Sequence, residues 1–361
     1  MTESHPTART QERHEGRARD AFRWERMIRD ASRCLLVAEA GVNHNGSVAI
    51  GHQLIEMAAD CGADAVKFQT FDAASLVSLR AAPAPYQRGR SGGLGQYEML
   101  RRLALPTAAW KEYADHARER GLLFLSSPFD RESLQVVLDA GVQALKIPSG
   151  ELDNLAFIRS LGDCGLPLII STGMSSLDEV SAAVEAASAA PNVALLHCVS
   201  AYPAPVETSN LRAMVTMRDR FQLPVGWSDH TNGSLTAVIA VALGASMLEK
   251  HITIDRDLPG PDHSASADPD EFALYVSAVR ATEEALGDGA KRPTSEEDAN
   301  RRFVRRSYHA SRDLAPGDTI EEADVELLRP ADGIPPTAVV VGRAVARAVA
   351  AGQPLTEGDL R

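Results

Sequence analysis

Residues 34–70 read CLLVAEAGVNHNGSVAIGHQLIEMAADCGADAVKFQT and contain a complete strand–helix–strand pattern. An apolar run, Cys34–Ala38, is followed by a polar turn, an Ala-rich periodic segment over Ser47–Cys61 and a second apolar run over Ala63–Phe68. Continuous apolar runs are typical of parallel strands buried on both faces, and the spacing of apolar residues between them predicts a helix. The stretch therefore predicts a βαβ unit.

The same alternation continues to about residue 286, with further periodic segments over Thr107–Arg120, Ser175–Ala190 and Ser234–Leu243. Eight such units over about 250 residues predict an α/β fold of the (β/α)₈ (TIM) barrel type. A doubly wound open sheet is the alternative, but the turn after the first run reads EAGVNHNG rather than the usual Gly-x-Gly-x-x-Gly. The six other apolar runs are Leu122–Ser126, Ala144–Ile147, Pro167–Ile170, Val193–Leu196, Leu223–Trp227 and Ala245–Glu249.

The composition of the chain changes at both ends of this pattern. We expect a polar N-terminal tail over residues 1–32, with a short helix around Ala21–Ala31, and the barrel over residues 33–286. A polar linker over 287–300 then leads to a compact, loop-rich β domain over 301–361, where Pro and Gly punctuate short apolar pieces. The long connection that includes Arg80–Gln96 predicts a lid over the barrel mouth, with a passive insertion as the alternative.

Charge and cysteine content exclude several classes of protein. The 361 residues carry 37 Lys and Arg against 49 Asp and Glu, a net charge of −12, which argues against a nucleic-acid binder. Apolar runs stay shorter than the ~18 residues that a membrane-spanning helix needs, so we expect no membrane association. The four scattered cysteines indicate reduced thiols in a cytoplasmic protein.

Polar side chains follow every predicted strand, and in a (β/α)₈ barrel these strand ends meet at one mouth. Two of them, His230 and His251, would lie on adjacent strands and suit a divalent metal such as Mn²⁺, with substrate oxygens and water as the other ligands. Glu39, Glu151 and Glu249 are candidates for proton transfer or water activation.

The other polar strand ends divide into two groups by their chemistry. Lysines and small hydroxyls suit a phosphate ester with a neighbouring carboxylate, and Gln, Tyr and Asp suit hydrogen bonds to a polyhydroxylated substrate. The first group is Lys67, Lys146, Ser149, Ser171 and Ser228, and the second is Gln69, Tyr202 and Asp262.

The motifs that carry these residues resemble those of the sialic acid synthase family. They are AEAGVNHNG, DAVKFQTF, SSPFD, LKIPSGELDN, STGM, HCVSAYP, SDHT, LEKHI and GPDH. The resemblance covers about residues 33–361, because the C-terminal domain is similar to the family's antifreeze-like (SAF) domain. It implies a transferase that condenses phosphoenolpyruvate with N-acetylmannosamine, giving N-acetylneuraminate and phosphate by C–O cleavage.

The resemblance also implies a role for each matching residue. His230 and His251 would hold the metal, Mn²⁺ with Mg²⁺ or Co²⁺ as alternatives, and Glu39 and Glu151 would lie near the reacting atoms. The family's domain-swapped homodimer would bring Arg329 to the partner's sugar. One departure from the family's pattern is Ser200, where the resemblance leads us to expect Asn, as in several relatives. Phosphoenolpyruvate would bind Lys67, Lys146, Ser149, Ser171 and Ser228, and the sugar Gln69, Tyr202, Asp262 and Arg329.

Four alternatives to N-acetylmannosamine chemistry stay open at this point. The acceptor could be a diacetamido-trideoxyhexose, as in legionaminate- or pseudaminate-type synthases, or 6-phosphorylated N-acetylmannosamine. The motif Gly260–His263, GPDH, is closer to the neuraminate and legionaminate branches than to the pseudaminate branch. A barrel that joins phosphoenolpyruvate to another sugar phosphate would want a further basic patch. A non-catalytic carbohydrate- or ice-binding protein is the alternative from another class.

Overall fold

The computed structural model describes residues 33–82 and 94–361, which form two compact units that divide between Gly287 and Asp288. The expected tail over 1–32, with its helix around 21–31, lies outside the described residues. The same holds for residues 83–93, which make up most of the expected lid.

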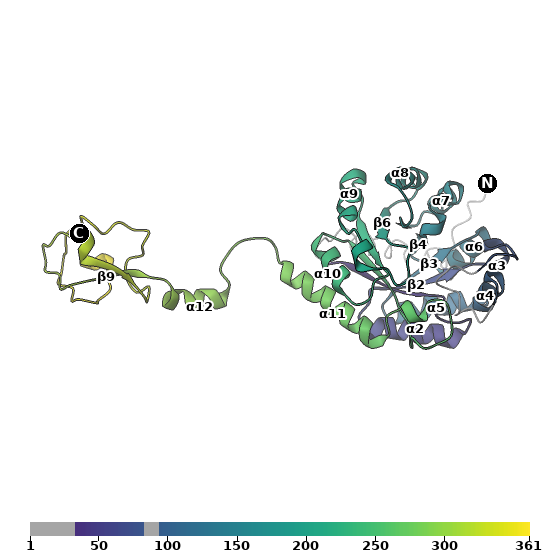
Figure 1. The fold of residues 1–361 in the computed structure, drawn as a ribbon, viewed down its shortest axis with the longest axis horizontal. Helices are drawn as coiled ribbons and strands as arrows, with labels where there is room; N and C mark the ends of the chain where they lie inside the picture. The colour runs from purple at the N-terminus through teal and green to yellow at the C-terminus, as the bar shows by residue number, and fades with distance from the viewer. Residues whose placement is uncertain (1–32, 83–93) are drawn as a thin grey trace, which may run out of the picture. The chain divides into compact units, whose positions relative to one another are not determined.

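Eight parallel strands of the first unit close into a barrel in chain order (Figure 1), which confirms the (β/α)₈ prediction. Every strand overlaps one of the predicted apolar runs, but all except β4 continue past the C-terminal end of the run. In the other seven strands the parallel ladder continues into residues that follow the apolar run, most of them polar, whereas hydropathy marks only the apolar part. The strands are β1 (Leu35–Gly41), β2 (Ala65–Thr70), β3 (Leu123–Pro128), β4 (Ala144–Ile147), β5 (Leu168–Ser171), β6 (Val193–Cys198), β7 (Val225–Asp229) and β8 (Met247–His251).

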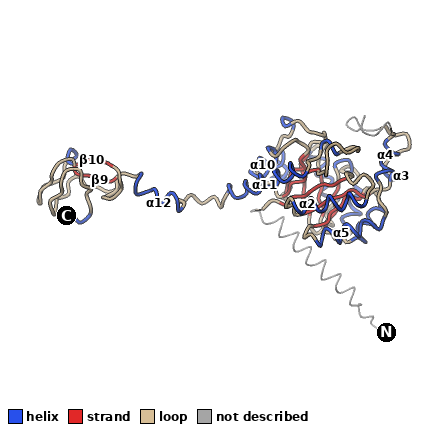
Figure 2. The backbone as a smooth tube through the Cα atoms, turned by 90° about the horizontal axis from the view of Figure 1, so that it is seen from below, coloured by secondary structure: helices blue, strands red, loops and turns tan. Residues whose placement is uncertain are grey.

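Helices surround the strands, as the blue and red segments of the first unit in Figure 2 show. Side-chain caps fix where several of them begin: Ser47 accepts from the backbone of α2, and Ser176 forms a capping box with Glu179 at α8. The helices are α2 (Val48–Asp60), α3 (Ala73–Leu76), α4 (Gln96–Leu103), α5 (Thr107–Glu119), α6 (Arg131–Ala140), α7 (Leu155–Gly162), α8 (Leu177–Ala186), α9 (Arg212–Phe221), α10 (Leu235–Ala242) and α11 (Pro269–Leu286), with short 3₁₀ turns η2 (Ser149–Glu151), η3 (Val206–Thr208) and η4 (His263–Ala265).

Side chains alternate between the two faces of each strand, which gives the barrel two apolar layers. Leu36 and Ala38 of β1 pack in the cluster between strands and helices. Leu35 and Val37 belong to a second cluster, with Leu123, Ile169 and Met247 from other strands. That second cluster fills the barrel interior, so the next residue on the inner face of β1 is Glu39.

The second unit is a small, loop-rich β domain, as predicted. Its antiparallel pair β9 (Ser307–Ala310) and β10 (Val325–Leu328) packs on an apolar cluster that includes Ile320, Val345 and Leu355. Helix α12 (Ser295–Val304) begins inside the segment 287–300 that the sequence predicted to be a linker. The turns η5 (Glu322–Asp324) and η6 (Glu357–Asp359) complete the unit.

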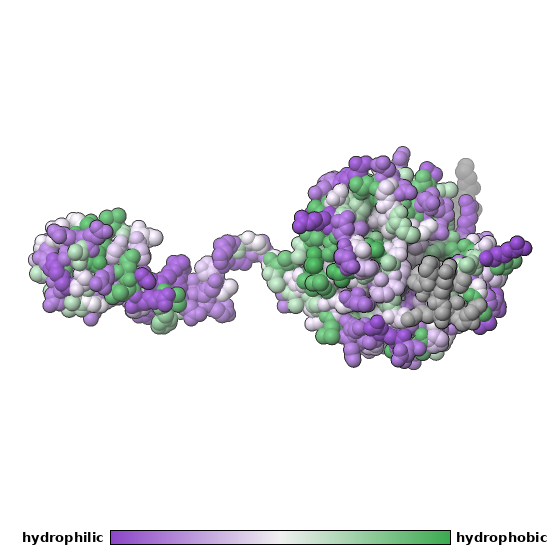
Figure 3. All heavy atoms as spheres, in the orientation of Figure 1, coloured by the Kyte–Doolittle hydropathy of each residue, from purple (hydrophilic) through white to green (hydrophobic). Residues whose placement is uncertain are grey.

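The surface of the first unit is mixed in polarity. Exposed Leu235 and Ile239 of α10 and Leu274 of α11 belong to the outer helix layer, and Figure 3 shows hydrophobic side chains where these helices lie in Figure 1. In the described residues, each helix is too short or too polar to cross a membrane. All four cysteines are described and are free thiols.

Candidate active site

The strand ends of the barrel carry polar side chains at one level. Register pairs Glu39 of β1 with Lys67 of β2 on one side and with His251 of β8 on the other. On the neighbouring strands, Ser228 of β7 pairs with Glu249 of β8. Because these residues follow the inner apolar layer along their strands, their side chains enter the barrel mouth.

Four of these residues form a buried cluster that we call the charged quartet: Glu39, Lys67, Lys146 and Glu249. Each is between 1% and 4% exposed. Lys67 Nζ lies 2.6 Å from Glu39 Oε2 and 3.6 Å from Glu249 Oε2. Lys146 Nζ donates to both oxygens of Glu249, at 2.9 and 3.0 Å, and Ser228 Oγ donates to Glu249 Oε1 at 2.9 Å. Two positive and two negative groups thus neutralise one another in the mouth.

The pKa values of the two carboxyl groups in the quartet are shifted in opposite directions. Burial raises the pKa of Glu39 even though Lys67 lowers it in part. Burial also opposes the charged form of Glu249, but Lys146 and Lys67 outweigh it and hold the Glu249 pKa well below its usual range. Desolvation lowers the pKa of Lys146. Glu39 is therefore the carboxylate of the quartet that accepts a proton more readily.

His230 and His251 lie together beside the quartet, with ring centroids 5.6 Å apart. Burial, followed by the neighbouring charges of His251 and Lys67 respectively, lowers the pKa of each imidazole to about 3. The Tyr202 ring contacts both, at 4.2 and 5.8 Å between centroids. Both imidazoles are thus neutral near pH 7, the form in which histidine binds a metal.

The two imidazoles fit the ligand role that the sequence suggested for them. His230 Nδ1 donates to the Val199 carbonyl at 2.7 Å, which fixes the tautomer and leaves the lone pair on Nε2. Nδ1 of His251 is buried and finds no hydrogen-bond partner among the described residues. Within residues 33–82 and 94–361, no group of three or more His, Cys, Asp or Glu side chains is arranged to hold a metal. Further ligands would have to come from substrate or water.

Small side chains crowd around Gly173 on the other side of the mouth. Its N–H donates to Ser149 Oγ at 3.0 Å, and Ser149 Oγ lies 3.1 Å from Cys198 Sγ. A Cβ on Gly173 would approach Ser200 Oγ to 2.4 Å and both Ser149 Oγ and Cys198 Sγ to 2.8 Å. Only glycine therefore lets these three side chains converge there.

A third group of residues adjoins Glu39. Gln69 Nε2 donates to Glu39 Oε1 at 3.0 Å. Asp262 is half-buried, and desolvation of its carboxyl raises its pKa to about 7, with the charge of Glu39 adding to the rise. Gly41 adopts φ +52° after a break in the β1–β2 register, a conformation that favours glycine, and lies where the side chains of Glu39, Gln69 and His251 meet.

Comparison with known proteins identifies the family. The family model described as NeuB family matches residues 54–291. The chain belongs to the NeuB family. A SAF domain model matches residues 305–361, which fall in the second unit. Both the sialic acid synthase resemblance and the expected C-terminal domain are thereby confirmed, and the protein is an enzyme of the nonulosonic acid synthase class.

Three relatives of this NeuB-family chain illustrate its place in the family. It is 44% identical to an N,N′-diacetyllegionaminic acid synthase of Legionella pneumophila, over 89% of this chain and 93% of the relative. It is 42% identical to the enzyme of the same name from Campylobacter jejuni, over 83% and 91%. The crystal structure of an N-acetylneuraminic acid synthetase from Leptospira borgpetersenii, in complex with citrate, superposes with a TM-score of 0.65 at 31% identity, covering 74% of this chain and 90% of the other.

Not every expected residue of the NeuB-family site joins the quartet. Ser171 is buried at the end of β5. Glu151 follows β4 on η2, and its carboxylate accepts from Asn154 at 2.8 Å; in the described residues no hydrogen bond or ion pair connects it to the quartet. Arg329 is exposed in the second unit, directly after β10.

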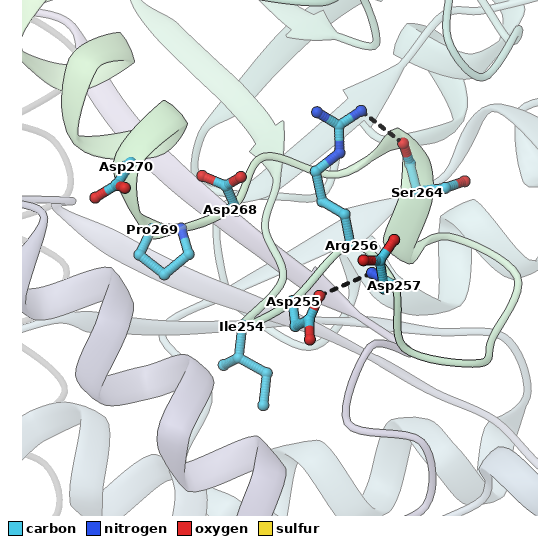
Figure 4. A pocket seen from close by; sticks show the side chains of 8 residues that line it. All are labelled: Ile254, Asp255, Arg256, Asp257, Ser264, Asp268, Pro269 and Asp270. Atoms are coloured by element: carbon cyan, nitrogen blue, oxygen red, sulfur yellow. Dashed lines mark hydrogen bonds between the residues drawn. The ribbon is translucent and has the colours of Figure 1, made fainter.

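A cavity of about 750 Å³ lies elsewhere, in the connection between β8 and α11 (Figure 4). Arg256 in its wall donates to the Ser264 carbonyl. Four carboxylates line the cavity and would repel the anionic substrate of a NeuB-family enzyme, and none of its lining residues belongs to the charged quartet or to the other strand-end residues described above. The carboxylates are Asp255, Asp257, Asp268 and Asp270.

The structure differs from the sequence-based interpretation of this NeuB-family site at two residues. Glu249 was considered for proton transfer, but its lowered pKa and its bonds to Lys146 make it a counter-ion. Cys198 was not considered, although it ends β6 within the motif HCVSAYP and contacts Ser149. Its position as the last residue of a barrel strand was the signal.

Proposed function

We propose that this enzyme condenses phosphoenolpyruvate with a 2,4-diacetamido-2,4,6-trideoxyhexose to give a legionaminate-type nine-carbon acid and phosphate. Two relatives above 40% identity, which match this chain over most of its length, carry the legionaminic name and support this acceptor. N-acetylmannosamine, which the resemblance put first, becomes the alternative. The GPDH motif at Gly260–His263 is compatible with both sugars.

The charged quartet carries the proposed reaction. The carboxylate and phosphate of phosphoenolpyruvate compete with Glu249 for Lys67 and Lys146, and the hydroxyls of Ser149, Ser171 and Ser228 complete their binding. C3 of phosphoenolpyruvate then attacks the open-chain aldehyde of the sugar, which forms the new carbon–carbon bond and leaves a cationic C2. The aldehyde π bond breaks in that attack and leaves an alkoxide on the sugar. Water adds to C2, one of its protons passes to the alkoxide by way of Glu39, and phosphate leaves with the other as the C2–O bond breaks, which gives the C2 ketone.

Glu39 takes the proton of the attacking water in this scheme. Its raised pKa and its place beside Gln69 and Asp262 support this choice over Glu151, which bonds to Asn154 instead. A divalent metal held by His230 and His251, Mn²⁺ being our choice, would polarise the carbonyl of the sugar. Tyr202, Gln69 and Asp262 orient the sugar.

The acceptor can be tested by phosphate release. With phosphoenolpyruvate and Mn²⁺, we expect kcat/KM for 2,4-diacetamido-2,4,6-trideoxymannose to exceed that for N-acetylmannosamine by at least about tenfold, or ~1.4 kcal/mol. A site that hydrogen-bonds the second acetamido group discriminates against a sugar that lacks it. Reactions with chelator, and with Glu39→Gln, serve as controls. Preference for N-acetylmannosamine would reverse the assignment, and no phosphate release with either sugar would reject the reaction.

A separate proposal concerns Arg329 and a second copy of the chain. The resemblance supports a domain-swapped homodimer in which this exposed side chain reaches the partner's sugar. We expect His230→Ala and Arg329→Ala to be inactive alone and to regain activity after subunit exchange, because one site of the mixed dimer then keeps both residues. Size-exclusion chromatography with two differently tagged variants verifies exchange. A verified mixed dimer without activity, or a fully active Arg329→Ala variant, would contradict the proposal.

A further inference from the structure

Asp229 of β7 and Lys250 of β8 form an ion pair on the helix side of the barrel, behind the active site. Their side chains are 0% and 5% exposed, with Lys250 Nζ 3.6 Å from Asp229 Oδ2, and the two residues are direct register partners. Alternation along the strands turns them away from the mouth, whereas Ser228, Glu249 and His251 face into it. The proposed reaction makes no use of either charge.

Hydrogen bonds tie this pair to the chain around His230. The Asp229 carboxylate accepts from Thr231 N at 2.9 Å and from Thr231 Oγ1 at 2.7 Å, and its other oxygen accepts from Thr236 Oγ1 at 3.1 Å. Lys250 Nζ donates to the Thr231 carbonyl and lies 5.3 Å from the centre of the Tyr275 ring. These bonds hold Asp229 and Thr231, the residues on either side of His230. The bond from Lys250 connects β8 to the turn that follows β7.

Stability alone does not explain why two charges are buried here. Desolvating an ion pair costs several kcal/mol per ion, and well-packed apolar side chains in the same place are often as stable. What apolar side chains cannot supply is a directional connection between two strands. That connection lies one residue before His230 on β7 and one residue before His251 on β8.

We propose that Asp229, Lys250 and Thr236 are positioning residues that hold the imidazoles of His230 and His251 at the separation required for metal binding. The proposal rests on the metal site of the proposed function. Outer-sphere partners that orient metal ligands typically change metal affinity or activity 10–100-fold when they are removed. Here the partners act through the backbone on both histidines at once, because they restrain the turn after β7 and the end of β8 together.

The test measures Mn²⁺ binding by isothermal titration calorimetry, without substrates, on the full chain. We expect Asp229→Asn to raise the Kd for Mn²⁺ about 10–100-fold. Thr236→Val removes, at nearly constant volume, the hydroxyl that bonds Asp229 Oδ2 and lies 2.7 Å from Thr231 Oγ1, and should raise the Kd by a smaller factor. Thr236→Ser keeps the hydroxyl and should restore wild-type affinity. Thermal unfolding of each variant is recorded in parallel.

Asp64→Asn is the matched control. Asp64 pairs with Arg280 at 2.6 Å and accepts from the backbone of Leu36, at the beginning of the strands, so its loss should lower the melting temperature without changing the Kd. Wild-type Mn²⁺ affinity in folded Asp229→Asn and Thr236→Val would overturn the positioning role; if Asp229→Asn does not fold, Thr236→Val decides. A wild-type protein that binds no Mn²⁺ would instead reject the metal part of the proposed function, and this inference with it.

Discussion

Replacing Lys146 by Met should lower the free energy of unfolding by about 3 kcal/mol, because it leaves Glu249 in the barrel mouth without its closest counter-ion. Lys146 donates to both oxygens of Glu249, and Lys67, at 3.6 Å, compensates only in part. The same variant should also raise the KM for phosphoenolpyruvate far more than that for the sugar, since a lost contact to a buried substrate anion costs ~2–5 kcal/mol. Urea denaturation and steady-state kinetics measure the two effects.

A double variant separates stability from substrate binding. Lys146→Met/Glu249→Gln removes the uncompensated charge as well, so it should regain much of the lost stability while the KM for phosphoenolpyruvate stays high. Glu249→Gln alone is the matched control. The role of the quartet would be refuted by a Lys146→Met variant with unchanged stability and unchanged KM. Equal increases in both substrate KM values would refute the assignment of Lys146 to phosphoenolpyruvate.

His230→Ala and His251→Ala should each reduce turnover by at least about a thousandfold, or ~4 kcal/mol, because each removes one of two protein ligands of the proposed metal. The fold should survive, since the His230 ring loses one bond to the Val199 carbonyl and a long 3.4 Å contact to Ser228 Oγ, and Nδ1 of His251 makes no hydrogen bond among the described residues. Phosphate release measures the loss of turnover, Mn²⁺ titration measures the loss of metal binding, and circular dichroism shows whether the fold is intact.

His52→Ala is the control for the two ligand variants. His52 lies on α2 and its Nδ1 is 2.8 Å from Nδ1 of His116, in the outer layer of helices. Its removal should leave Mn²⁺ binding and turnover unchanged. Wild-type turnover in either ligand variant, after metal stripping and readdition, would show that the metal is held elsewhere or is not needed.

The barrel could be predicted from the sequence because each strand is a short, continuous apolar run. The positions of Glu39, Lys67 and His251 followed from the same rule, since parallel strands end at one mouth. The segment 287–300 was predicted to be a linker because it is polar. Thr294 and Glu297, however, form a capping box, and this pattern in the sequence indicates the beginning of helix α12. The capping residues therefore indicated a helix that the polar composition of the segment did not.

The ion pairs between side chains on opposite sides of the barrel mouth could not be predicted from hydropathy and strand order. Lys146 and Glu249 are 103 residues apart, and nothing in their spacing indicates that their side chains meet. Their contact depends on the diameter of the barrel and on the direction in which each long side chain extends. The same holds for the shift of the Glu39 pKa, which arises from burial.

The opposite orientations of Glu249 and Lys250 also protect the barrel against misfolding. If β8 slipped by one residue against β7, every side chain of β8 would move from the barrel interior to the helix side, or the reverse. Glu249 would then be buried beneath α10 and α11 without the lysines, and Lys250 would enter the mouth without Asp229. Burying such unpaired charges costs several kcal/mol, so the slipped register is strongly depopulated, and the chemistry that serves catalysis also selects the correct strand alignment during folding.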